Sequence, residues 1–188
     1  MRRKTTCGLV TLLLLLAGTV AAQEANVERT PSSRAEFDME IYLIIGSKTG
    51  GEMRLPSELN PVLRRLRAAL PLSNYRLGMK LLGKITSGSN FQLSGVRYSA
   101  DFLQGLAEDK FSYLIRGSLK DAAPAPILTT ELAMRLPFRA PNMNVVSESV
   151  SMSSSFFVRE GEPIIAGSLD LTAGESLIWV INLRRVAP

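Results

Sequence analysis

Ser57–Leu70 is the only segment of this chain with a clear helical pattern, and it limits the folds that the rest can adopt. Five apolar residues recur at helical spacing and form one stripe: Leu59, Val62, Leu63, Leu66 and Leu70. Arg64, Arg65 and Arg67 lie off this stripe. A helix with one apolar face must bury that face against another element. The segment therefore predicts a helical lid on a mostly antiparallel β structure.

The chain on either side of this helix alternates apolar and polar residues, which is the period of a β-strand. Phe37–Ile45 alternates over nine residues, and later segments repeat the pattern. Ser176–Val186 is apolar on both faces from Leu177 to Ile181, which predicts a central strand covered on both sides and anchored by Trp179. We therefore predict an α+β, mostly β fold, with one amphipathic helix packed on a largely antiparallel sheet or sandwich of about eight strands.

Local patterns also predict details of the strands. Four residues are expected to share one strand face: Tyr75, Leu77, Met79 and Leu81. The turn residues 87–90 predict a hairpin that pairs this strand with the next one, which contains Phe91. Pro137 and Pro141 are expected to bracket a loop. Asp38 and Glu40 are expected to be solvated charges on the outer face of an amphipathic strand, rather than an acid pair.

The N-terminus has the pattern of a secretory signal peptide. A basic start, Arg2 to Lys4, precedes the apolar run Leu9–Ala17, and small residues end at Ala22. The run is shorter than the ~20 residues that span a bilayer. Cys7 precedes the run, whereas a lipidated cysteine should follow it. The pattern predicts export of a bacterial protein, with cleavage between Ala22 and Gln23.

The sequence predicts three segments. Residues 1–22 are the signal peptide, residues 23–36 are a polar, flexible leader, and residues 37–188 are a single mostly-β domain. The ambiguous stretch Ser99–Lys110, either a loop or a short helix, is the place where two lobes would divide. The 166 residues from Gln23 are enough for one core of ordinary size.

Composition narrows the possible activities. Without Arg2, Arg3 and Lys4, the 22 Lys and Arg residues become 19 against 17 Asp and Glu, a net charge near +2 that gives no support for nucleic-acid binding. The chain has no histidine, and its only cysteine leaves with the signal peptide. These absences remove the commonest general base, the thiol nucleophile and nearly all zinc sites. We therefore expect no catalytic residue, no metal site and no cofactor.

A row of serines marks the segment Val146–Val158. Apolar residues share one face of this predicted strand, and the other face consists of Ser147, Ser149, Ser151, Ser153 and Ser155. A charge-poor row gives poor protection against edge pairing, so it is a candidate interaction surface, although a plain solvent face is the simpler explanation. Arg64, Arg65 and Arg67 form a candidate basic helix face for an acidic partner or lipid head groups, or a solvated helix back.

The closing stretch resembles the end of bacterial secretins, the outer-membrane rings of secretion and pilus systems. The matching positions are Arg159–Glu162, Ile164–Leu169 and Glu175–Ile181, although Gly-Gly-Leu is replaced by Gly-Ser-Leu and the proline of the last strand by Leu183. The chain also resembles a group of uncharacterised exported bacterial envelope proteins with an L-P-x-E-L-x-P-V helix, matched by Leu55–Val62. The second resemblance implies an envelope location and no particular activity.

These observations predict a non-catalytic binding or assembly module of the cell envelope, periplasmic or associated with the outer envelope. The expected partner is an envelope protein or a second copy, with the secretin-like tail favouring a secretion or pilus machine. No nucleic acid is expected, and any membrane contact after signal cleavage should not span the bilayer. Two alternatives are a small outer-membrane or lipid-binding β-barrel and a periplasmic hydrolase that works without histidine.

Overall fold

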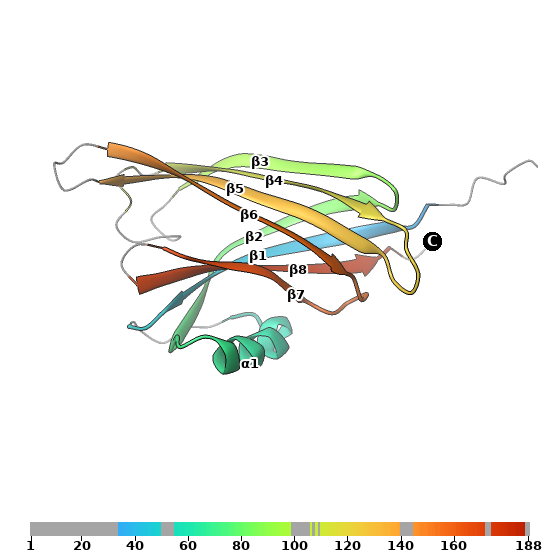
Figure 1. Cartoon of the computed structure of the whole chain (residues 1–188), viewed down its shortest axis with the longest axis horizontal. Helices are drawn as coiled ribbons and strands as arrows, with labels where there is room; N and C mark the ends of the chain where they lie inside the picture. Colours follow the sequence, from blue (N-terminus) through green and yellow to red (C-terminus); the bar gives the residue numbers. More distant parts are fainter. Residues whose placement is uncertain are drawn as a thin grey trace, which may run out of the picture. The chain divides into compact units, whose positions relative to one another are not determined.

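The helical lid predicted from Ser57–Leu70 forms, and it covers one of two four-stranded sheets (Figure 1). The computed structural model describes residues 34–49, 55–98, 106, 108, 110–139, 145–171 and 174–186. All of them belong to one compact unit, Arg34–Pro188. The predicted signal peptide, nearly all of the leader and most of 99–110 lie outside the described residues.

The described elements follow in this order: β1 (Glu36–Ser47), a 3-10 turn (Ser57–Leu59), α1 (Asn60–Ala69), β2 (Asn74–Thr86), β3 (Asn90–Tyr98), β4 (Lys110–Lys120), β5 (Ile127–Arg139), β6 (Val145–Phe157), β7 (Ile164–Asp170) and β8 (Glu175–Arg185). Sheet A has the strand order β2-β1-β8-β7, and sheet B has the order β3-β4-β5-β6. Every pair in both sheets is antiparallel. The predicted α+β, mostly β sandwich of about eight strands is confirmed.

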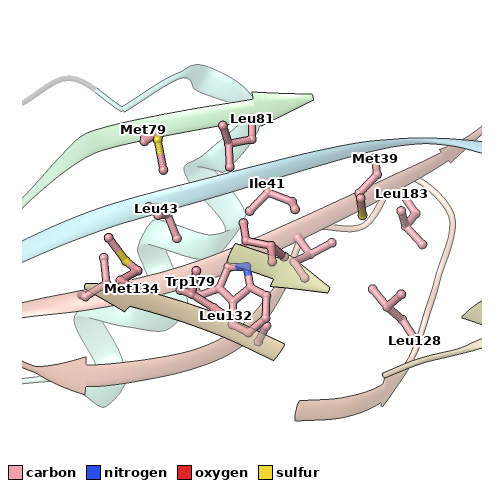
Figure 2. Packing of buried hydrophobic residues seen from close by; sticks show 14 of the residues in the cluster. Met39, Ile41, Leu43, Met79, Leu81, Leu128, Leu132, Met134, Trp179 and Leu183 are labelled. Carbon is pink, nitrogen blue, oxygen red and sulfur yellow. The ribbon is translucent and has the colours of Figure 1, made fainter. Parts of the chain in front are cut away.

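Sheet A is buried on both faces because α1 covers one face and sheet B covers the other. The cluster under the helix contains Tyr42, Ile178 and Leu66, whereas the cluster between the sheets contains Ile41 and Trp179. Figure 2 shows Trp179 of β8 beside Leu132 and Met134 of β5. The two-sided apolar run in β8 was therefore interpreted correctly, and Trp179 is 0% exposed.

Bulges in two strands of sheet A change which face a side chain occupies. Leu43 of β1 pairs with Met79 and Ile44 pairs with Leu77, so Gly78 is left without a partner in the ladder. An extra residue of this kind moves the next side chain to the other face. Met79 consequently packs between the sheets, whereas Leu77 packs under the helix. The prediction of one shared face from Tyr75 to Leu81 was wrong for this reason.

The predicted hairpin between β2 and β3 was also wrong, because the turn after Thr86 crosses from sheet A to sheet B. β2 pairs with β1, and β3 pairs with β4. Gly88, at φ 75°, donates its backbone N–H to the Leu119 carbonyl at 2.7 Å. Pro137 lies inside β5 rather than in a loop. The ladder between β5 and β4 ends at Arg135, two residues before this proline, so its missing N–H removes no hydrogen bond to β4.

Candidate interaction edge on strand β6

The five serines of the predicted row lie on β6 with their side chains exposed on the outer face of sheet B: Ser147, Ser149, Ser151, Ser153 and Ser155. Four of their cross-strand neighbours on β5 are Pro137, Ala133, Glu131 and Thr129. Thr129 and Ser155 are joined by a hydrogen bond of 3.1 Å between their hydroxyl oxygens. The alternation therefore gave the correct face for the whole row.

This outer face of sheet B contains few charges near its centre. Gln92, Arg116, Glu131 and Ser153 are aligned across the four strands, and Arg116 and Glu131 form an ion pair at 2.8 Å. A shallow hollow of about 540 Å³ lies over these residues. The side chains around it are mainly amides and hydroxyls, so the hollow offers hydrogen-bonding groups and little net charge.

Strand β6 is an edge strand of sheet B, and it is the longest regular edge among the described strands. It pairs with β5 over all 13 of its residues without a register shift, and Glu148 is its only charged residue. The other three edges are modified or shorter. β2 carries Arg76, Lys80 and Lys84 and a bulge, β7 has 7 residues and a bulge, and β3 has 9 residues. Lysines, bulges and short length are the usual protections against pairing with another chain.

The edges of β6 and β7 converge at one end and separate at the other (Figure 1). At the near end, the Ser154 hydroxyl donates to the Ala166 carbonyl. Toward the other end a cavity of about 510 Å³ separates the strands; we call it the lateral groove, and it is lined by Phe138, Glu148, Ser149, Val150, Ser151, Leu169, Asp170 and Leu171. No ladder between the described residues joins β6 to β7. The first half of β6, Val145–Ser151, therefore has an open backbone edge.

The predicted basic helix face has one acidic partner in a neighbouring connection. Arg64, Arg65 and Arg67 are all exposed on α1. Arg65 donates to Glu162 in the connection from β6 to β7 at 2.9 Å. This ion pair lowers the pKa of Glu162. One of the three charges is thus engaged in holding α1 to the neighbouring connection.

The sequence did not predict a polar network between α1 and sheet A. Glu40 accepts hydrogen bonds from the Tyr42 hydroxyl and the Asn182 amide, each at 3.0 Å, and lies 3.0 Å from the Lys80 ammonium. The Tyr42 hydroxyl also lies 3.0 Å from the Glu58 carboxylate. The prediction of a solvated Glu40 was wrong, because the helical lid covers that face of β1 and leaves its side chain 15% exposed. Asp38, two residues earlier, is exposed as predicted.

The network moves its proton equilibria away from neutral pH. Burial raises the pKa of Tyr42 to about 12. The hydrogen bond to Glu40 raises the pKa of Lys80 despite its partial burial. Burial alone would raise the pKa of Glu40, but hydrogen bonds from Lys80, Tyr42 and Asn182 outweigh it and lower the pKa. A general acid or base works best with a pKa near the operating pH. Groups with these shifted pKa values are therefore better suited to holding the helix on the sheet than to exchanging protons.

No protein-family model and no curated protein matches the chain. The described residues contain no group of three or more His, Cys, Asp or Glu side chains arranged to hold a metal ion. Within the same residues, no helix has both the length and the apolar character needed to cross a membrane.

The interaction edge and the lateral groove differ in how far they could be found from sequence. The serine row was visible because alternation alone gives the face of a strand. Phe138, Glu148 and Leu171 were missed as groove residues, because they meet only when β5, β6 and β7 are placed in two sheets. No local signal identifies β6 as an edge strand, since that depends on which strands pair.

Proposed function

We propose that this protein is an exported, non-catalytic binding or assembly module of the bacterial cell envelope. In this proposal it contacts another envelope protein, or a second copy of itself, through the region from Val146 to Leu169. The observation that carries the proposal is the regular, charge-poor and partly open edge of β6. An exposed edge of this kind accepts an added strand by main-chain hydrogen bonding.

Two sequence features support an envelope role. The N-terminal pattern supports export, and an intact mass of the exported protein that begins at Gln23 would test it; a mass retaining Met1–Ala22 would contradict it. The closing strands β7 and β8 carry the secretin-like residues, and the end of β7 lies across the lateral groove from the open edge of β6. A secretion or pilus machine is therefore the specific assembly that we propose for the contact.

The contact is tested by placing lysines at Ser147 and Ser151, whose neighbours on β5 are the uncharged Pro137 and Ala133. Ser147→Lys/Ser151→Lys should abolish binding to the envelope partner, or self-association measured by light scattering, because lysines on an edge disfavour strand addition. The melting temperature should change little, because both side chains are exposed. Co-purification from the protein's own envelope fraction, with and without the substitutions, is the first measurement.

A matched control lies on the other edge of the same sheet. Asn90 and Ser94 are exposed residues of β3 with the same spacing, so Asn90→Lys/Ser94→Lys adds the same charge to the same face. This control should retain the association. Equal association of the folded β6 variant and wild type would refute the β6 surface. A hydrolytic turnover that survives purification and is lost with one Ser or Asp substitution would refute the non-catalytic proposal.

A further inference from the structure

The lateral groove has an apolar floor and an acidic residue, Glu148, on its β6 side. Phe138, Leu169 and Leu171 are partly buried against the core between the sheets, and Val150 is 8% exposed. Glu148 contributes a carboxylate from β6, and Asp170 of β7 also lines the groove. Asp170 accepts a hydrogen bond from Ser176 at 2.7 Å. None of the described residues that line the groove is a lysine or an arginine.

The open half of β6 is poorly suited to pairing with itself. If Val145–Ser151 of two copies paired antiparallel over their full length, the central residue of each segment would face its equivalent. That residue is Glu148. Like charges directly opposite each other destabilise an antiparallel pair. Other registers of the two copies avoid this opposition but leave fewer residues paired. The segment therefore disfavours pairing with a second copy and favours a strand that carries a positive charge.

We infer that the edge of β6 and the lateral groove together bind an extended segment of another protein, with a lysine or arginine opposite Glu148 and apolar residues two positions to either side. This inference rests on the proposed function and identifies the chemistry of its partner. Alternate side chains of an added strand point to the same face. A cation opposite Glu148 therefore places its second neighbours opposite Val146 and Val150, where apolar side chains contact the groove.

The inference is tested with synthetic peptides and the mature protein. The probe is a seven-residue peptide with threonine at odd positions, valine at positions two and six and arginine at position four. The control peptide has glutamate at position four. Titrations followed by amide chemical shifts should show changes in Val145–Ser151 and β7 with the arginine peptide, and binding at least about threefold weaker with the glutamate peptide, as expected for one partly exposed charge pair.

A charge reversal makes the test specific. Glu148→Arg should reverse the preference, so that the glutamate peptide binds more tightly than the arginine peptide. Glu148→Gln should remove the preference and keeps the shape of the side chain. Glu148 is exposed, and melting temperatures verify that both variants fold. Equal binding of the two peptides by wild type, or an unchanged preference in Glu148→Arg, would overturn the inference.

The two proposals fail in distinguishable ways. In one outcome, Ser147→Lys/Ser151→Lys loses the envelope association but wild type binds the two peptides equally. This outcome would support β6 as the contact surface and refute only the inference that its partner is a basic strand. Retention of that association would refute the proposed function at this edge. Stronger self-association of Glu148→Gln than of wild type would support the inference, because this substitution removes the opposed carboxylates that disfavour pairing between copies.

Discussion

Tyr42 and Tyr75 are two buried tyrosines of the same cluster that differ in what their hydroxyls contact. The Tyr42 hydroxyl donates to Glu40 and lies 3.0 Å from Glu58, whereas the Tyr75 hydroxyl is buried without a hydrogen-bond partner among the described residues. Removing an unpaired buried polar group should cost nothing, and breaking a paired one leaves its partner unsatisfied.

Phenylalanine substitutions should therefore have different effects on the free energy of unfolding. Tyr75→Phe should leave it unchanged or raise it by up to about 1 kcal/mol, and Tyr42→Phe should lower it by about 1–2 kcal/mol. Urea denaturation of each variant measures both values. A larger loss for Tyr75→Phe than for Tyr42→Phe would mean that the hydroxyl of Tyr75 has a partner in solution.

Glu40 should make stability depend on pH in the acidic range. Its folded pKa is lowered from the ordinary value of 4.5, so its contribution is complete above that unfolded value and is lost as the pH falls through the folded pKa. Glu40→Gln should lower the free energy of unfolding at pH 7 by about 1–2 kcal/mol and flatten its decline at acidic pH. Asp38→Asn, on the same strand but exposed, is the control and should follow wild type. If the free energy of unfolding of Glu40→Gln falls as steeply at acidic pH as that of wild type, this carboxylate is not the source of the decline.

At the scale of the element, α1 is stabilised by burial of one face. Leu66 is 2% exposed, and Arg64 is exposed on the same helix. Leu66→Asp should lower the free energy of unfolding by more than about 3 kcal/mol, because it buries an unpaired charge. Arg64→Ala should change it by no more than about 0.5 kcal/mol. Similar melting shifts for the two variants would show that the helix does not pack through this face.

Elements were predicted well where one local pattern decides the outcome. The double-sided apolar run of β8 required cover on both faces, and α1 and sheet B supply it. The turn after Thr86 was located correctly, but its residues do not determine whether the two strands pair or separate into different sheets. Gly78 could not be recognised as a bulge, because a bulge is defined by the register with β1.

At the scale of the whole molecule, the eight strands follow one another in chain order around the sandwich. Within a sheet, strands that follow one another in sequence pair with each other, and β8 pairs with β1. The chain passes from one sheet to the other between β2 and β3 and again between β6 and β7. The sequence predicted the number of strands but not these two divisions. The candidate edge and groove arise at the second division, so only the serine row of the site could be predicted.

The pairing of β1 with β8 has a consequence for how the chain is made. β8 lies between β1 and β7 at the centre of sheet A, yet it leaves the ribosome after the other seven described strands. Sheet A therefore cannot be completed while Glu175–Arg185 is still inside the ribosome or a translocation channel. Contacts between residues so distant in sequence also form slowly. In the export that we propose, this order of strands would keep the chain unfolded and threadable until β8 has been synthesised.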